Sequence, residues 1–391
     1  MLAACSNSND SNNSNPDSNG SNGSGGSTLN ISAVVATAAP DFSSGAVSLA
    51  NTIAPYAAQN GLDATISDIA VRGDGDHYFL IKRFGTDQIQ RYDAATPATP
   101  TYTYSTNDSS TEDSNPRDLI IASETKGYLI RYGSGKLWIV NPSATTEAAF
   151  KIGEIDLSQY DADGVPEMSA GLIKNGKLYV AMQRLDSSFA ATQNGYVAVI
   201  DTATDIEIST GANSSGLNGI ELPLRDPYRL VSVPDSNAIL VAADGGYDGS
   251  FNQQYDGGVV SIDPDNSYGT TLLLDDGDSN SHPYGTFADV TVAAGDRGYF
   301  IGSTGFGGTQ SLYRFNPGSP DTPVPVSNFQ NLELGPIAVD PNGNLWLGQI
   351  NTSAPGLTVL GFQGGTETVL EPLIDTVLTP LNIDFVSVLS N

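Results

Sequence analysis

A repeated step from a proline into a short apolar run is the feature of this sequence that most restricts its fold. Six X-Pro steps of this kind occur, 44 to 61 residues apart. Their prolines are Pro116, Pro166, Pro227, Pro283, Pro336 and Pro380. A seventh unit, which lacks the proline, begins at Ser67. Because a period of about 50 residues is typical of β-propeller blades, the spacing predicts seven blades.

Each unit continues with further apolar runs that are separated by turns. After Pro116, runs at Asp118–Ile121 and Gly127–Ile130 precede a third run that ends at Asn141. The third runs of four other units also end in an acidic or amide residue, namely Asp93, Asp201, Asp263 and Asn316. A fourth stretch such as Thr101–Tyr104 completes the unit. No long stretch has apolar residues at helical spacing, so we expect an all-β fold of four-stranded antiparallel blades.

The two ends of the chain supply complementary parts of one blade. The segment Ile383–Val388 has the pattern of a first strand with nothing after it. The segments Ser32–Thr37 and Ala46–Leu49 have the pattern of second and third strands with no first strand before them. We therefore expect the N-terminal strands to pair with the C-terminal strand and close the ring, which protects the strand edges.

The N-terminal sequence has the pattern of a signal for attachment to a membrane. The tetrapeptide that ends at Cys5 (Leu-Ala-Ala-Cys) resembles the lipobox of bacterial lipoproteins, in which the cysteine is acylated. Residues 6–27 are almost entirely Ser, Asn, Gly and Asp, a composition that favours a flexible tether. We therefore expect a lipobox remnant and tether over residues 1–29 and a propeller over residues 30–391. A lipidated Cys5 would anchor the protein in a bacterial cell envelope, at the outer membrane.

Four segments resemble the YncE/YVTN-type propellers, which include lipoproteins of bacterial envelopes. They are Asn115–Ile120, Leu137–Pro142, Asp161–Met168 and Ala198–Thr204. The resemblance covers roughly residues 30–391 and implies the propeller fold. It implies little about activity, because members of this superfamily are mostly binding or scaffold proteins.

Charge and rare residues exclude several kinds of function. The chain has 16 Lys and Arg residues against 44 Asp and Glu residues, a formal net charge of −28. Such a chain repels nucleic-acid phosphates and anionic lipid surfaces. A single cysteine excludes an intrachain disulfide, and two histidines, His77 and His282, leave little room for a transition-metal site. We expect no cofactor other than, as an open option, Ca²⁺.

Several cationic and aromatic residues are predicted to share one face of the propeller. The loop that leads into each first strand and the loop that leaves each second strand open on the same face, around the channel mouth. The candidate ligand-binding residues placed there are Arg83, Arg117, Arg131, Arg184, Tyr228, Arg229, His282 and Tyr284. Guanidinium groups bind carboxylates and phosphates in a two-pronged manner, so this set suits an anionic ligand. Alternatively, each arginine pairs with an acid such as Asp118, Asp186 or Asp289 and ties adjacent blades together.

Acidic residues offer a second type of site. The turns Asp161–Gly164, Asp263–Asn266 and Asp275–Asp278 are rich in oxygen ligands for Ca²⁺, but Asp, Asn and Gly also dominate ordinary turns, which is the favoured interpretation. Glu167 and Asp289 are the candidate inward ligands for an ion in the channel. No GxSxG elbow is present, and His282 has no recognisable serine partner.

These patterns favour a monomeric, non-enzymatic binding or scaffold propeller. It would take an anionic small molecule or an envelope protein as its partner. The alternative is a Ca²⁺-dependent hydrolase or lactonase that uses the central channel.

Overall fold

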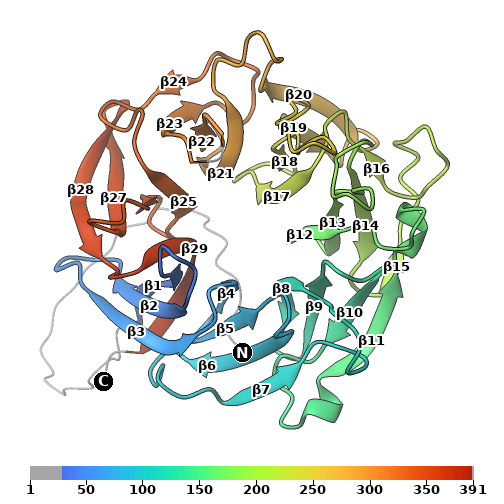
Figure 1. Cartoon of the computed structure of the whole chain (residues 1–391), viewed down its shortest axis with the longest axis horizontal. Coiled ribbons are helices and arrows are strands. Elements are labelled where there is room, and N and C mark those ends of the chain that lie inside the picture. Colours follow the sequence, from blue (N-terminus) through green and yellow to red (C-terminus); the bar gives the residue numbers. More distant parts are fainter. Residues whose placement is uncertain (1–28, 306, 390–391) are drawn as a thin grey trace, which may run out of the picture.

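The fold is a ring of seven β-sheets around a central axis (Figure 1). A computed structural model describes residues 29–305 and 307–389, and Cys5, the cysteine of the predicted lipobox, lies outside these residues. Every sheet has four antiparallel strands in a row. Six of the sheets follow chain order, the seventh places the C-terminal strand before three N-terminal strands, and one sheet has an additional short strand. The prediction of an all-β, seven-bladed propeller is confirmed.

The strands take equivalent positions in the seven blades. The innermost strands are β29 (Thr379–Leu389), β4 (Ile69–Asp74), β8 (Pro116–Ser123), β12 (Met168–Lys174), β17 (Pro227–Ser232), β21 (Thr286–Ala294) and β25 (Leu334–Val339). The second strands are β1 (Leu29–Ala38), β5 (His77–Lys82), β9 (Lys126–Arg131), β13 (Lys177–Met182), β18 (Ile239–Ala243), β22 (Arg297–Ser303) and β26 (Leu345–Gln349). The third strands are β2 (Gly45–Asn51), β6 (Gln88–Asp93), β10 (Lys136–Val140), β14 (Tyr196–Asp201), β19 (Gly258–Asp263), β23 (Gln310–Phe315) and β27 (Gly356–Gln363).

The outer strands are shorter or more irregular. They are β3 (Ala58–Thr65), β7 (Tyr102–Ser105), β11 (Lys151–Asp156), β15 (Ile206–Glu207), β20 (Gly269–Asp275), β24 (Val324–Pro325) and β28 (Thr366–Asp375). The additional strand β16 (Ile220–Glu221) pairs with β14. Two single-turn 3₁₀-helices are present, η1 (Glu147–Ala149) and η2 (Ser158–Tyr160). Among the described residues, no helix has the length and apolar character needed to cross a membrane.

The second strands have continuous apolar runs because they are buried on both faces. In β5, Tyr78 and Leu80 pack into one hydrophobic cluster, whereas Phe79 and Ile81 pack into the next one around the ring. Alternate side chains of a strand point to opposite faces of its sheet, so one run fills two cores. The apolar runs that suggested blades in the sequence are therefore the contacts between blades.

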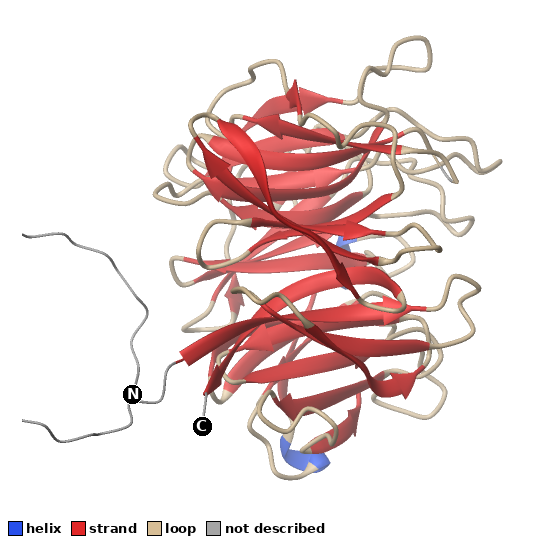
Figure 2. Cartoon of the chain, turned by 90° about the vertical axis from the view of Figure 1, so that its left-hand side faces the viewer, coloured by secondary structure: helices blue, strands red, loops and turns tan. Residues whose placement is uncertain are grey.

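The two ends of the chain close the ring. Strand β29 pairs antiparallel with β1, and the register places Thr379 beside Ala38 and Asp384 beside Val34. The predicted closure by an N-terminal and a C-terminal strand is confirmed. Because the innermost strands all begin at one end of the channel, this register places Leu29 at the opposite end, where both ends of the described chain emerge (Figure 2).

Candidate functional site

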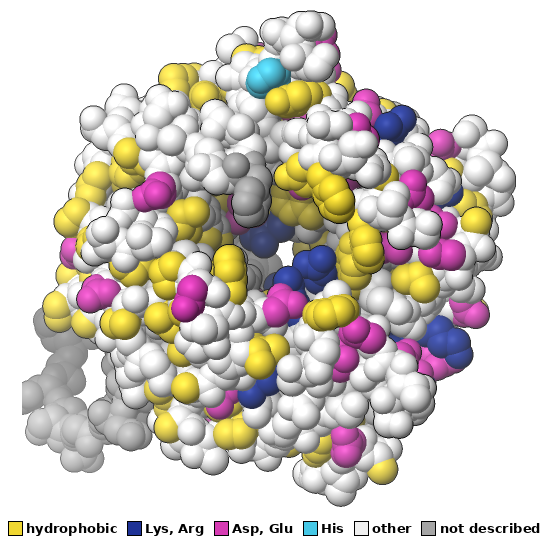
Figure 3. Space-filling model, viewed as in Figure 1, with side chains coloured by type: hydrophobic (Ala, Val, Ile, Leu, Met, Phe, Trp, Pro, Cys, Tyr) yellow, Lys and Arg dark blue, Asp and Glu magenta, His cyan; other side chains and the backbone are white. Residues whose placement is uncertain are grey.

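The innermost strands line a channel of about 620 Å³ along the axis of the ring. We call the end where these strands begin the mouth. The charged side chains in the lining are Arg72, Arg83, Arg117, Asp118, Arg229, Asp289 and Asp384. Lys and Arg side chains are visible inside the channel opening, with hydrophobic side chains gathered around it (Figure 3). A protein of net charge −28 thus concentrates cationic groups on its axis.

The arginine deepest in this set, Arg72, is neutralised by its neighbours. Its Nε donates a hydrogen bond of 3.0 Å to Asp118, and a terminal nitrogen forms an ion pair with the same carboxylate. A second ion pair joins it to Asp384 at 3.4 Å. Burial alone would lower the pKa of Arg72, but the two carboxylates raise it above its ordinary value. Arg72 therefore connects three blades and has little capacity left for a ligand.

Arg83 and Arg117 lie closer to the mouth and have fewer acidic partners. Arg83 follows the end of β5 and donates a hydrogen bond of 2.7 Å to Asp68. Arg117 is the second residue of β8, and no acidic side chain of the described residues lies within 4.0 Å of it. Its guanidinium carbon lies 4.4 Å from the centre of the Tyr132 ring. Its Nε is buried, and no group in the described structure accepts a hydrogen bond from it.

The two guanidinium groups repel each other. Burial lowers the pKa of Arg83, and the positive charge of Arg117 lowers it further. Only Asp68, which is partly exposed, raises the pKa of Arg83 by direct pairing. Two like charges in a partly buried opening are stabilised when an anion binds between them, because the low local dielectric strengthens both attractions.

A pair of half-buried acids lies beside this cationic group. Asp226 precedes β17 and Asp244 follows β18, and their carboxyl groups interact with each other. Burial, followed by the charge of Asp244, raises the pKa of Asp226 to about 8, although Arg117 partly offsets this increase. One oxygen of Asp226 is buried without a hydrogen-bond partner among the described residues. The pair therefore holds a proton at neutral pH and presents a polar atom that can bind a ligand.

Tyr228 and Arg229 extend the site around the channel. Both line the channel from β17, and the Tyr228 hydroxyl is buried with no partner in the described structure. Arg229 has a loose ion pair of 3.5 Å with Asp289. A side hollow of about 370 Å³ shares Tyr228 with the channel and is also lined by Asp244. The mouth thus combines cationic groups, a tyrosine hydroxyl and a protonated acid.

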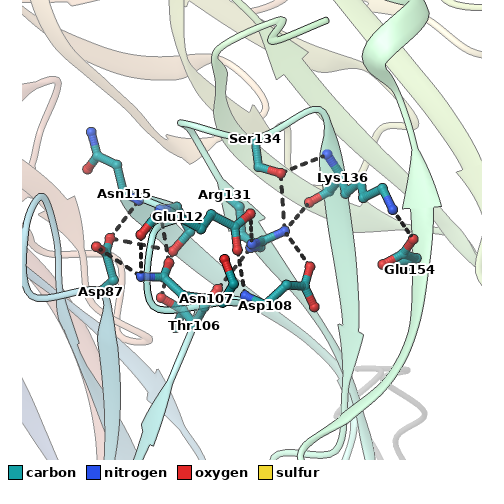
Figure 4. A network of polar contacts seen from close by, with 12 residues as sticks. Asp87, Thr106, Asn107, Asp108, Glu112, Asn115, Arg131, Ser134, Lys136 and Glu154 are labelled. Atoms are coloured by element: carbon teal, nitrogen blue, oxygen red, sulfur yellow. Dashed lines mark hydrogen bonds and ion pairs between the residues drawn. The ribbon is translucent and has the colours of Figure 1, made fainter.

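Two of the candidate arginines lie away from the channel. Arg131 is fully buried, with its guanidinium carbon 4.2 Å from the centre of the Trp138 ring. It forms an ion pair with Glu112 and donates a hydrogen bond of 3.0 Å to the carbonyl of Thr106 (Figure 4). The expectation that Arg131 faces the mouth is corrected: the segment between β7 and β8 folds over it. The sequence repeat predicts that Arg131 lies at the end of β9, but it does not predict the direction in which the side chain points.

Arg184 also binds groups within the propeller and does not face the channel. It donates hydrogen bonds of 2.7 Å to the carbonyl of Tyr160 and 3.0 Å to that of Asn194, and it lies over the ring of Tyr196. Its contacts come from its own blade and the preceding loop, and it does not line the channel. For Arg131, the structure thus favours the alternative in which an arginine pairs with a nearby acid, whereas Arg184 binds backbone carbonyls instead of an acid.

The two candidate residues before β21, His282 and Tyr284, do not face the channel. His282 stacks on Tyr255, with ring centres 4.3 Å apart, in an exposed loop. Tyr284 packs edge-on against Phe300 and Tyr313 at the side of a hydrophobic cluster. Neither residue lines the channel. Of the eight candidates, the structure brings together Arg83, Arg117, Tyr228 and Arg229.

The two candidate metal ligands do not share a site. Asp289 lines the channel, but its oxygens accept hydrogen bonds from the N–H groups of Val290 and Ile337, each at 2.9 Å. Glu167 is outside the channel lining and accepts a hydrogen bond of 2.9 Å from the N–H of Leu185. Burial raises the pKa of Glu167 to about 8. No group of three metal-ligating side chains occurs in the part of the chain that the structure describes.

The Asp-rich turns use their carboxylates to stabilise their own backbone. Asp163 accepts a hydrogen bond from the N–H of Val165, Asp263 from Asp265 and Asp278 from Asn280. These are the short-range contacts by which Asp favours turns.

Comparison with known proteins supports the fold and leaves the ligand open. No protein-family model and no curated protein matches the chain. Among solved structures, a protein from Lactobacillus plantarum is 13% identical with a TM-score of 0.62, over 92% of this chain and 99% of that one. Virginiamycin B lyase from Staphylococcus aureus is 13% identical with a TM-score of 0.54, over 81% of this chain and 90% of that one.

A third similar structure is a quinonprotein alcohol dehydrogenase-like protein from Bacteroides thetaiotaomicron. It is 12% identical with a TM-score of 0.53, over 90% of this chain and 77% of that one. At this identity the likeness concerns the propeller fold alone, because unrelated functions share such folds.

Proposed function

We propose that this protein is a binding or scaffold propeller that takes an anionic ligand at the channel mouth. The observation that supports the proposal is the environment of Arg117. No acidic side chain of the described residues lies within 4.0 Å of this guanidinium, although its charge partly offsets the rise in the pKa of Asp226. Arg117 lies on the ring of Tyr132 and is close enough to Arg83 to lower the pKa of Arg83. A carboxylate or phosphate between the two arginines would supply the missing counter-charge.

The test is a thermal-shift titration of the full chain with citrate, succinate and inorganic phosphate in a low-salt, non-coordinating buffer. A ligand that binds only the native state raises the melting temperature in a saturable manner. We expect the shift to disappear in the double variant Arg83→Gln/Arg117→Gln. Arg297→Gln is the matched control, because Arg297 also lies on an aromatic ring, Phe362, but begins a second strand at the opposite end of the blade. Equal shifts in all three proteins, or none in any, would refute the proposal.

A hydrolase at the same mouth is the second candidate function. The acid pair Asp226–Asp244 favours it, because a carboxyl group that holds a proton near neutral pH can act as a general acid or base. The predicted Ca²⁺ ligands Glu167 and Asp289 do not share a site, so a Ca²⁺-dependent form of this hypothesis would need other ligands. Turnover of lactone or ester substrates that is lost in Asp226→Asn would support a hydrolase, and additional loss with a chelator would support the Ca²⁺-dependent form.

We further propose that Cys5 is lipidated and anchors the propeller in a bacterial envelope, at the outer membrane. With Leu29 at the end of the channel opposite the mouth, a tether over residues 1–29 would allow the mouth to face away from the anchoring membrane. Metabolic labelling with an alkyne fatty acid tests this: label and membrane association should both be lost in Cys5→Ser. Unlabelled wild-type protein that fractionates as soluble would contradict it.

A further inference from the structure

Four exposed phenylalanines lie in equivalent loops on the mouth side of the ring. Phe42, Phe84, Phe189 and Phe251 are 70%, 66%, 68% and 77% exposed, respectively. They lie in the loops β1–β2, β5–β6, β13–β14 and β18–β19, each of which joins the second strand of a blade to the third. These loops open on the mouth side of the ring. We call the four residues the phenylalanine collar.

Three members of the collar share one backbone conformation. Phe42, Phe189 and Phe251 have φ angles of 56°, 60° and 60°, in the left-handed region. In each, the phenylalanine N–H donates a hydrogen bond to the carbonyl three residues earlier, at 2.9, 2.8 and 2.9 Å. Each turn therefore presents its phenylalanine at the tip of the loop.

The backbone conformation of three collar residues does not favour phenylalanine. A bulky side chain in the left-handed region is unfavourable, and Gly or Asn takes this conformation more readily. Burial of the ring would compensate for the strain, but these rings are mostly exposed to water. Large apolar side chains that are both strained and exposed at equivalent sites on one face indicate a surface for binding.

The collar is continuous with the cationic mouth. Phe42 lines a hollow of about 380 Å³ together with Asp68 and Arg83, and Arg83 also lines the channel. Phe84 directly follows Arg83 in the sequence. Figure 3 shows hydrophobic side chains around the opening and Lys and Arg side chains within it. An object that rests on the collar can therefore place a negative group between the arginines.

The size and charge of the surface favour a protein as the occupant. The collar residues belong to four different blades, so a single small molecule in the channel would not contact them all. Asp41, Asp186 and Asp248 lie in the same turns as Phe42, Phe189 and Phe251. These acids and the net charge of −28 oppose contact with an anionic bilayer. Aromatic anchors around a charged centre are typical of protein interfaces.

We propose that the phenylalanine collar docks a partner protein that places a carboxylate, from a loop or its C-terminus, between Arg83 and Arg117. The carboxylate part of this inference rests on the proposed anion site, whereas the collar is an independent observation. Apolar groups of the partner cover the phenylalanine rings, and the carboxylate supplies the counter-charge that Arg117 lacks.

The test is selection of short random peptides with free carboxyl ends on the immobilised full chain. Selected sequences are then synthesised, and their affinities are measured by fluorescence anisotropy. We expect peptides that combine a terminal or side-chain carboxylate with Leu, Phe or Trp. Phe189→Asn/Phe251→Asn should weaken binding by about tenfold or more, as is typical when aromatic anchors are removed. Ile53→Asn/Ile206→Asn is the matched control, because Ile53 lies in the β2–β3 loop and Ile206 begins the outer strand β15, both exposed and at the opposite end of the channel.

The outcomes separate this inference from the anion site. Loss of peptide affinity in the collar variant, with no change in the control, supports docking on the collar. Selected peptides that respond to Arg83→Gln/Arg117→Gln but not to the collar variant overturn the docking surface and leave the anion site intact. Binding of small anions with no peptide selected also overturns it. Collar-dependent binding to zwitterionic lipid vesicles, with no peptide selected, would replace a protein with a membrane surface.

Discussion

The carboxylate of Asp289 accepts a hydrogen bond of 2.9 Å from the backbone N–H of Ile337, which belongs to the next blade. Asp384 forms the same connection to the N–H of Gly73, at 3.0 Å, across the closure of the ring. The innermost strands of neighbouring blades are not paired in one sheet, so their N–H groups need other acceptors. Carboxylates in the channel wall thus accept hydrogen bonds from backbone N–H groups of the adjacent blade.

Asp289→Ala is predicted to destabilise the propeller by about 1–3 kcal/mol, because it leaves the buried N–H of Ile337 without an acceptor. Chemical denaturation of the wild-type and variant proteins measures the difference. Asp375→Ala is the control, since Asp375 is exposed at the end of an outer strand and its carboxylate accepts a hydrogen bond only from the N–H of Val377, within its own turn. Similar losses in both variants would contradict a special role for the connection between blades.

Replacement of Arg131 should affect folding, whereas replacement of Arg117 should not. Arg131→Ala removes the buried partner of Glu112 and the contact with Trp138, and is expected to cost about 3 kcal/mol. Arg117→Gln removes a charge that repels Arg83, so its free energy of unfolding should change by less than about 1 kcal/mol. Denaturant melts of the two variants test the contrast. If Arg117→Gln is the more damaging, the assignment of Arg117 to the mouth fails.

The sequence predicts the ring but only part of the site. The spacing of Pro116, Pro227 and Pro336 marks the innermost strands, because the repeated unit is the blade itself. Closure follows from the unpaired strand patterns at the two ends. The repeat also places Arg83 and Arg117 at the mouth, since the positions of strand ends are enough to locate them.

The remaining site residues depend on side-chain directions that the repeat does not determine. Arg131 ends its strand as expected, yet it is covered by the segment that carries Glu112. Arg72 and Asp384 face the channel from the middle of their strands, where the alternation of side chains is the only signal. The acid pair Asp226–Asp244 joins the residue before a first strand to the residue after a second strand, and neither position is unusual in an acidic chain.

Buried carboxyl groups should make the protein less stable at alkaline pH. Burial raises the pKa of Glu167 to about 8, well above its value in the unfolded chain, so the folded state binds more protons in this range. The stability that the proton confers is complete below the unfolded pKa and is lost as the pH rises through about 8. Glu167→Gln is therefore expected to raise the melting temperature at pH values near 8 and to change it little near pH 5.

Glu154→Gln provides the opposite control in the same melting experiment. Hydrogen bonds from Lys136 and Lys151 lower the pKa of Glu154 to about 2. Its contribution is present above its unfolded pKa and is lost as the pH falls towards 2, so this variant should differ most from the wild type at neutral pH. Melting curves of the two variants that shift in parallel across the pH range would refute both assignments.

Removal of the strained phenylalanines should stabilise the protein. Phe189 and Phe251 have left-handed backbone conformations, which are unfavourable for phenylalanine. Because their rings are exposed, burial of apolar surface does not compensate for this strain. Asn adopts this conformation more readily, and Phe189→Asn is expected to raise the free energy of unfolding by up to about 1 kcal/mol. Phe84→Asn is the matched control, because Phe84 is equally exposed but does not have a positive φ angle. Urea denaturation of the three proteins measures the effect.

A gain in stability in Phe189→Asn and none in Phe84→Asn would show that the collar is retained at the expense of stability, as expected of residues that serve binding. A loss of stability in Phe189→Asn would instead show that its ring packs onto the fold, and the collar would then be part of the framework.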